Sequence, residues 1–262
     1  MDPTETPIMP AVAPFTITPQ QQDQYREEGY FILESVIPPE HLELLRDVAM
    51  RVIEAERKKA AENGGKSNGI NHANNRIFST FPSKEYAELK RFYRSELMAE
   101  ICRATIGPTA FYFWEQYVIK AAEKGMKFSW HQDSGYCRSV PNHPPYLTCW
   151  CALDDMSEAN GTAYILPFSK AGTKTVQEHV KDEATNDWVG YHGDEPGIPV
   201  LAPAGSIAVF SSVTFHRSGF NRTPNWRRVY LAQYSPIPMA QPDGKIMGRA
   251  EPFLKEGRIV EG

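Results

Sequence analysis

At residue 109 the spacing of apolar residues changes from helical to extended. Beyond this point, β-branched and aromatic residues form short runs that Gly, Pro and Asn interrupt, a pattern typical of strands. The predicted strands are Ala110–Ala121, Phe128–Asp133, Tyr146–Asp154, Thr162–Pro167, Ser206–Phe210, Phe215–His216 and Arg228–Ser235. Many short strands that follow a helical segment favour a mainly β fold with flanking helices, such as a sandwich or jelly roll.

The segment before residue 109 predicts helices. Thr18-Pro19-Gln20-Gln21 offers an N-cap and a capping box, so a short helix should run to about Glu28 and end at Gly29. Tyr30–Leu33 should form a strand, a longer helix should begin at Pro38-Pro39, and a further helix, capped by Ser83, should extend to Gly107.

These patterns predict one domain over residues 18–262, with helices mainly in 18–106 and a jelly-roll core at about 109–237. Residues 1–17 contain four prolines among small residues, which disfavours a helix and predicts a flexible N-terminal arm.

Charge and hydropathy exclude some function classes. Lys and Arg total 28 against 32 Asp and Glu, a formal charge of −4, so no overall basic field favours nucleic acid or an anionic membrane. No apolar run approaches the roughly 20 residues of a membrane span, and no signal-peptide pattern opens the chain, so we expect a cytoplasmic protein. Cys102, Cys137, Cys149 and Cys151 lack zinc-type spacing and should remain reduced thiols.

The residues that suggest a catalytic metal site are His131, Asp133 and His216. Residues i and i+2 of a strand point to the same face, so the His131 imidazole and the Asp133 carboxylate should converge. His216 lies in another predicted strand and would supply a third ligand. Two imidazoles and one carboxylate form the facial triad of non-haem Fe(II) oxygenases, which leaves coordination positions open for dioxygen and a co-substrate. An isolated H-x-D pattern, however, occurs often by chance.

Arg227 strengthens the hypothesis. A 2-oxo acid that chelates iron leaves its far carboxylate several ångströms away, where a planar guanidinium can bind it through two hydrogen bonds. Arg227 and Arg228 are adjacent in a predicted strand, and only one of them can enter the barrel.

The motifs together resemble the phytanoyl-CoA dioxygenase family. Members carry H-x-D, a distal His, a Ser two residues after it and an Arg eleven residues after it, as do His216, Ser218 and Arg227 here. The resemblance extends over about residues 17–237, because Tyr25–Leu33, Thr148–Gly161 and Ile165–Ser169 also look like family segments.

The resemblance implies a double-stranded β-helix that uses Fe(II), 2-oxoglutarate and O2. Iron would bind His131, Asp133 and His216, and the co-substrate would bind Arg227 with the help of Ser218. Trp150 matches the family's tryptophan beside the co-substrate, and Gln116 aligns with a co-substrate contact on a neighbouring strand. Thr148 shares the strand face of Trp150 and is expected to contact the co-substrate too, whereas Cys149 and Cys151 face the other way. The expected reaction is hydroxylation of an unactivated C–H bond in a small-molecule metabolite, or a related desaturation, because halogenases of this fold leave the position of Asp133 uncharged.

Two rival classes remain open at this point: a cupin-type metal enzyme that does not use 2-oxoglutarate, and a non-catalytic jelly-roll binding domain. The substrate and the oligomeric state are not readable from the sequence. Aromatic residues near the predicted metal indicate either an apolar or ring-containing substrate or an aromatic core; these are Phe111, Tyr112, Phe113, Trp114, Trp130, Tyr136 and Tyr146.

Three further features have open roles. Arg138 is either a contact for a substrate anion or a solvated side chain. The Asp182–Pro199 segment is long for a strand connection and suggests a lid. The polar stretch Asn68–Arg76 could also face the site.

Overall fold

The computed structural model describes residues 15–62, 76–123, 126–183 and 187–261. The larger sheet contains, in spatial order, β1 (Tyr30–Leu33), β10 (Ile207–Ser211), β5 (Leu147–Ala152), β12 (Arg227–Ser235), β3 (Ala110–Lys120), β13 (Glu251–Lys255) and β14 (Arg258–Ile259), and β2 (Arg76–Thr80) also pairs with β3. The smaller sheet contains β4 (Phe128–His131), β11 (Phe215–Ser218), β6 (Ala163–Leu166) and β9 (Ile198–Pro199), while β7 (Val180–Lys181) pairs with β8 (Trp188–Val189).

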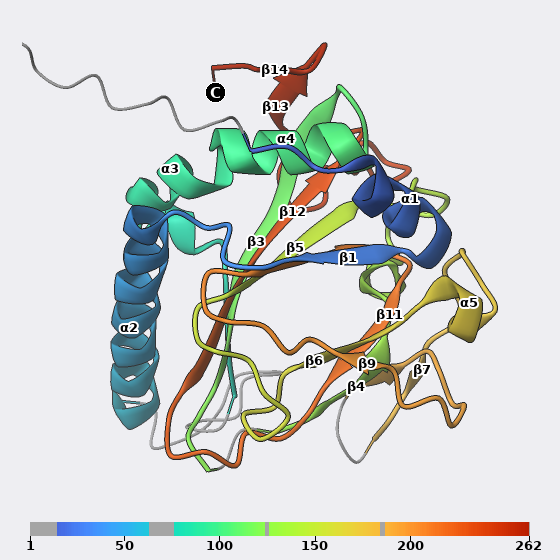
Figure 1. The fold of residues 1–262 in the computed structure, drawn as a ribbon. Coiled ribbons are helices and arrows are strands. Elements are labelled where there is room, and N and C mark those ends of the chain that lie inside the picture. The colour runs from blue at the N-terminus through green and yellow to red at the C-terminus, as the bar shows by residue number, and fades with distance from the viewer. Residues whose placement is uncertain (1–14, 63–75, 124–125, 184–186, 262) are drawn as a thin grey trace, which may run out of the picture.

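Both sheets contribute to one interior. Trp150, Phe210 and Leu231 of the larger sheet form a buried cluster with Ala163 and Ile165 of the smaller one. The strand pairs are antiparallel throughout the described ranges. The predicted double-stranded β-helix is therefore confirmed, and the two sheets are seen in Figure 1.

Helices cover the outer face of the larger sheet. They are α1 (Pro19–Glu28), α2 (Pro39–Glu62), α3 (Lys90–Tyr93) and α4 (Glu96–Thr105), while the short α5 (Phe168–Ala171) contacts α1. In Figure 1, α2 runs beside β3 and β12, and α4 crosses above them. The apolar stripes of α2 and α4 pack against outward-facing residues of β3, β5, β10 and β12 in the main hydrophobic core. No helix of the described residues has both the length and the apolar character that a membrane span requires.

The predicted start and end of α1 are confirmed. The Thr18 hydroxyl accepts from the Gln21 backbone N–H, the Gln21 side chain accepts from the Thr18 N–H, and Gly29 adopts a left-handed φ of 81°. The boundary of the predicted arm is wrong at one residue: Ile17 is 1% exposed and packs in the main core. Residues 1–14 lie outside the described ranges.

The helix predicted from Ser83 to Gly107 is divided. It consists of η1 (Pro82–Lys84), η2 (Ala87–Leu89), α3 and α4, and Ser95 caps α4 by accepting from the Met98 N–H. Ser83 does not act as the expected cap, because its backbone N–H donates to the buried Glu115 carboxylate over 3.0 Å. This tertiary contact outweighs the local helix signal.

The Asp182–Pro199 segment lies beside the smaller sheet. Asp187 Oδ2 accepts from the Ser129 N–H at 2.9 Å, and the Gly190 N–H donates to the Trp130 carbonyl at 2.9 Å. These bonds hold the described part of the segment along β4, in the wall of the barrel.

Candidate active site

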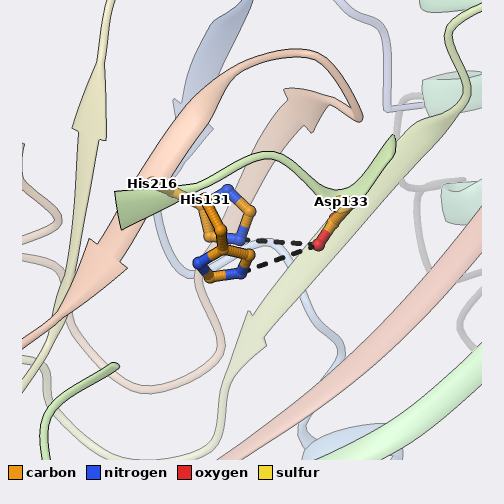
Figure 2. Close-up of side chains that lie close together, drawn as sticks. All are labelled: His131, Asp133 and His216. Carbon is orange, nitrogen blue, oxygen red and sulfur yellow. Dashed lines mark ion pairs between the residues drawn. The ribbon is translucent and has the colours of Figure 1, made fainter. Parts of the chain in front are cut away.

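His131, Asp133 and His216 converge inside the barrel (Figure 2). His131 is the last residue of β4 and pairs directly with His216 of β11. Asp133 Oδ1 lies 3.6 Å from His216 Nε2 and 4.0 Å from His131 Nε2. The predicted strand Phe128–Asp133 is too long, because β4 ends at His131 and Asp133 begins the turn η3 (Asp133–Tyr136). Its carboxylate reaches the imidazoles from this turn.

Backbone carbonyls orient both imidazoles. His131 Nδ1 lies 2.8 Å from the Ser129 carbonyl, and His216 Nδ1 lies 3.1 Å from the Thr214 carbonyl. A carbonyl only accepts, so each Nδ1 carries the proton and each Nε2 presents a lone pair. Burial, with the neighbouring His216, lowers the pKa of His131 well below its usual range, which keeps this ring neutral and able to bind a metal.

The two oxygens of Asp133 have different environments. Oδ1 faces the imidazoles, whereas Oδ2 accepts from Thr148 Oγ1 at 2.6 Å and from Gln233 Nε2 at 2.9 Å. Neighbours that hold one carboxylate oxygen fix the direction of the other. Thr148 is fully buried. It was predicted to contact the co-substrate, and in the structure its hydroxyl donates to Asp133.

Gln132, between two of the three residues, is also held firmly. Its backbone N–H donates to His179 Nε2 at 2.9 Å, and its side-chain Nε2 donates to the Val213 carbonyl at 2.5 Å. Gly135 and Gly190 pack against the His179 ring so closely that a Cβ on either would overlap it.

The donor set fits iron(II). One oxygen and two imidazole nitrogens lie within 4.8 Å of one another, and all three residues line a cavity of about 360 Å³. A two-histidine, one-carboxylate set with an open side is the arrangement that non-haem iron oxygenases use. The cavity is lined by Arg76, Phe78, Thr80, Phe113, Trp114, Gln116, Val118, Lys120, Phe128, His131, Asp133, Tyr136, Cys137, Tyr146, Trp150, Ala163, His216, Arg217, Ser218, Arg227, Leu231, Gln233 and Met247.

One end of the cavity is cationic. Arg227 is 1% exposed, its Nη1 donates to the Val118 carbonyl at 3.3 Å, and its Nε has no hydrogen-bond partner within the described ranges. Burial lowers the pKa of Arg227 to about 10, and no carboxylate of the described residues forms an ion pair with it. A buried guanidinium with unused donors is suited to an anionic ligand. Arg228 faces away and bonds to Asp154.

The predicted co-substrate contacts line the same cavity as Arg227. Trp150 and Gln116 both line the cavity, and the Arg227 guanidinium lies 5.9 Å from the Trp150 ring centroid. Ser218 also lines the cavity. The structure therefore brings Gln116, Trp150, Ser218 and Arg227 to the same cavity as the three metal-ligand candidates.

The opposite end, which we call the aromatic end, consists of Phe113, Trp114, Cys137, Tyr146 and Met247. Trp114 pairs with Gln233, six residues along β12 from Arg227, which at about 3.3 Å per residue places the two ends about 20 Å apart along the strand. The pairing register shifts at this point, and such a bulge lets the consecutive Phe113 and Trp114 both reach the cavity.

The other aromatic residues proposed from the sequence have different positions. Tyr112 is part of the main core, and Trp130 packs against Tyr191 and Arg217. Tyr136 is 40% exposed and contacts the His131 ring. Arg138 is exposed, lies over the Trp188 ring and donates to the His179 carbonyl. Of the stretch Asn68–Arg76, only Arg76 is described; it lines the cavity and pairs with Asp187.

Sequence reasoning missed Lys120 and Gln233. Lys120 lies in β3, where burial largely alternates, four residues from Gln116, and Gln233 lies in β12, six residues from Arg227. All four side chains line the cavity. The two-residue period could have identified them, since each is an even number of residues from such a neighbour.

Comparison with known proteins agrees with this arrangement. The phytanoyl-CoA dioxygenase family profile matches residues 25–229. The peroxisomal phytanoyl-CoA dioxygenase of Rattus norvegicus is 21% identical over 228 residues, which cover 82% of this chain and 67% of the relative.

Two solved structures have the same fold. The non-haem alpha-ketoglutarate-dependent carbocyclase SnoK from nogalamycin biosynthesis superposes with a TM-score of 0.67 at 18% identity, covering 96% of this chain and 97% of SnoK. EvdO2 from Micromonospora carbonacea var. aurantiaca, complexed with 2-oxoglutarate, gives 0.67 at 19% identity, covering 91% and 95%. Because the profile spans most of the chain and includes all three metal-ligand candidates, the chain belongs to the phytanoyl-CoA dioxygenase family of Fe(II)- and 2-oxoglutarate-dependent oxygenases.

Proposed function

We propose that this enzyme hydroxylates an unactivated C–H bond of a small, apolar molecule bound at the aromatic end. In the overall reaction, substrate, O2 and 2-oxoglutarate give hydroxylated substrate, succinate and CO2. The division of the cavity into a cationic end and an uncharged aromatic end carries the proposal. It provides one place for a dicarboxylate and a separate place for a molecule without charge.

The residues have separate roles in this proposal. His131, Asp133 and His216 hold the iron, which supplies the oxidising chemistry when bound. Arg227 binds the far carboxylate of 2-oxoglutarate with the help of Ser218, while Trp150 and Gln116 line the wall between. Thr148 and Gln233 keep Oδ1 of Asp133 directed at the metal. The carboxylate of Asp133 would also fill the metal position at which a halide binds in halogenases of this fold, and this favours hydroxylation.

The aromatic end supports an apolar substrate. Its five side chains carry no charge, and Phe113 and Tyr146 contact each other with ring centroids 5.0 Å apart. A carboxylate or phosphate placed there would lose its hydration without gaining a cationic partner from the described residues that form this end. An acyl-CoA is disfavoured for the same reason, so we do not extend the substrate of the family's namesake to this chain.

The experiment is an anaerobic titration of the apo-protein with Fe(II) and 2-oxoglutarate. A weak visible charge-transfer band is expected when both are bound, and its absence from folded protein would contradict the proposed site. Neutral ring compounds are then screened for stimulated succinate release, and ¹⁸O2 labelling of the product distinguishes hydroxylation from desaturation or ring closure. Product that lacks ¹⁸O would exclude hydroxylation.

A further inference from the structure

Lys120 is a buried cation that the reaction described above does not use. It is the last residue of β3 and pairs across the sheet with Arg227 of β12 on one side and Arg76 of β2 on the other. Its side chain is fully buried and lines the cationic end of the cavity. Three adjacent strands therefore place three basic residues side by side.

The ammonium group of Lys120 has three hydrogen-bond acceptors. Nζ donates to Ser218 Oγ at 2.8 Å, to the Gly161 carbonyl at 3.4 Å and to the Gly219 carbonyl. A lysine has three donors, so this set uses all of them. All three acceptors are neutral, and no carboxylate of the described ranges lies within ion-pair distance of Nζ.

This environment is unfavourable for a positive charge in the absence of a ligand. Burial, and then the neighbouring Arg227 and Arg76 guanidinium groups, lower the pKa of Lys120 well below its usual range. Lys120 and Arg227, which have no acidic partner among the described residues, repel each other, and an anion bound between them would offset both the repulsion and the desolvation. The cationic end can therefore accept more negative charge than the described residues around it supply.

The contact with Ser218 has a directional consequence. A serine hydroxyl has one proton and two lone pairs. Because Lys120 donates to the oxygen, the hydroxyl proton of Ser218 is left to donate to something else. No acceptor for it is found among the described residues, and the side chain lines the cavity beside Arg227.

We propose that Lys120 is a positioning residue for 2-oxoglutarate: it fixes Ser218 as a hydrogen-bond donor to the far carboxylate and, with Arg227, makes the pocket selective for a dicarboxylate. This inference rests on the proposed function, because it places the far carboxylate at Arg227 and Ser218. Lys120 acts through Ser218 and through its charge, and does not touch the reacting atoms.

The test compares two co-substrates that chelate iron identically. 2-Oxopentanoate has the five-carbon chain of 2-oxoglutarate with a methyl group in place of the far carboxylate. The dissociation constant of 2-oxopentanoate divided by that of 2-oxoglutarate therefore measures recognition of that carboxylate alone. Both constants are obtained from anaerobic charge-transfer titrations of the Fe(II) protein. Lys120→Met should weaken 2-oxoglutarate binding by about tenfold or more, the size expected for a charge-assisted hydrogen bond, and leave 2-oxopentanoate binding nearly unchanged.

Two further variants test the route through Ser218. If Lys120 orients the hydroxyl, Ser218→Ala should reduce the same ratio. The double variant Lys120→Met with Ser218→Ala should reduce the ratio by less than the product of the two single reductions. Lys120→Gln keeps donors for the glycine carbonyls while removing the charge, so it serves if Lys120→Met does not fold, and it should also lower the ratio.

The outcomes separate this inference from the proposed function. If Arg227→Met leaves the ratio unchanged, the co-substrate site itself is misplaced. If Arg227→Met lowers the ratio but the Lys120 variants weaken both co-substrates equally, Lys120 has only a structural role and the inference is wrong. Failure of both Lys120 variants to fold would also show that the role is structural and would overturn the inference.

Discussion

Gln233 donates from Nε2 to Oδ2 of Asp133 over 2.9 Å, and so connects a residue of the turn η3 to the central strand β12. The same Nε2 lies 2.9 Å from Thr148 Oγ1, which bonds to the same carboxylate oxygen. Asp133 begins a turn and not a strand, so its direction depends on these two side chains.

Gln233→Leu should therefore weaken Fe(II) binding about tenfold to a hundredfold, the usual effect of removing a group that orients a metal ligand. Fe(II) titration under anaerobic conditions measures the affinity. Gln20→Leu, on the exposed side of α1, makes the same chemical change far from the site and should have no effect. Equal affinities for the two variants would show that Gln233 does not orient Asp133.

Asp133→Ala or His131→Ala should abolish 2-oxoglutarate-dependent succinate formation, because each removes one of only three ligand candidates in this cavity among the described residues. Circular dichroism should show that the sheets remain folded. Turnover close to that of the unchanged enzyme in either variant would refute the metal assignment.

Arg227→Met should raise the dissociation constant of 2-oxoglutarate by about thirtyfold or more, since truncating one partner of a buried charge pair costs about 2–5 kcal/mol. Arg228→Met is the matched control, because this neighbour bonds to Asp154 outside the cavity. Arg227→Met should not lower the free energy of unfolding of the ligand-free protein, since it removes a buried guanidinium without an acidic partner among the described residues. An unchanged affinity would point to another anchor for the co-substrate.

Stability should depend on pH through His179. Burial lowers the pKa of His179 below its usual value, and Nε2 accepts from the Gln132 N–H. Below the ordinary pKa of about 6.5 the unfolded chain gains a proton that the folded ring resists. The free energy of unfolding should thus fall as the pH drops from about 7 to 5, a change that urea titrations can measure. His179→Gln should reduce this slope, and an unchanged slope in this variant would contradict the role of His179.

Glu115 should be important for folding. This fully buried carboxylate accepts from the Ser83 N–H at 3.0 Å and from the Tyr230 hydroxyl at 2.5 Å, and lies 3.7 Å from Arg249. Glu115→Leu leaves these donors unpaired and should lower the free energy of unfolding by about 3–5 kcal/mol. Glu251→Gln, at the more exposed end of the same network, should cost less than about 1 kcal/mol. Similar losses in the two variants would contradict this role.

Local signals in the sequence predicted much of this fold. Thr18 and Gly29 carry cap chemistry that does not depend on the rest of the chain, and alternation in β5 correctly separated Thr148 and Trp150 from Cys149 and Cys151, which pack in the main core. The divided helix after Ser83 could not be predicted, because Glu115, which accepts a hydrogen bond from the Ser83 N–H, lies 32 positions away in the sequence.

The candidate site shows the same limit. His131, Asp133, His216 and Arg227 follow from fixed spacings, so the sequence was sufficient to propose them. The contacts of Gln233 with Asp133 and of Lys120 with Ser218 join residues 100 and 98 positions apart. Such contacts depend on strand order and register, which spacing along one strand does not specify.

Strand β3 carries Phe113 and Trp114 at the aromatic end and Lys120 at the cationic end. Its register with β12 is continuous from Trp114 to Lys120, and the bulge separates only the residues before Trp114. Mutations at the aromatic end can therefore accumulate without displacing the side chains at the cationic end that bind 2-oxoglutarate. Proteins that evolve from such a chain can diverge in the compounds they oxidise while they keep the same metal and 2-oxoglutarate sites.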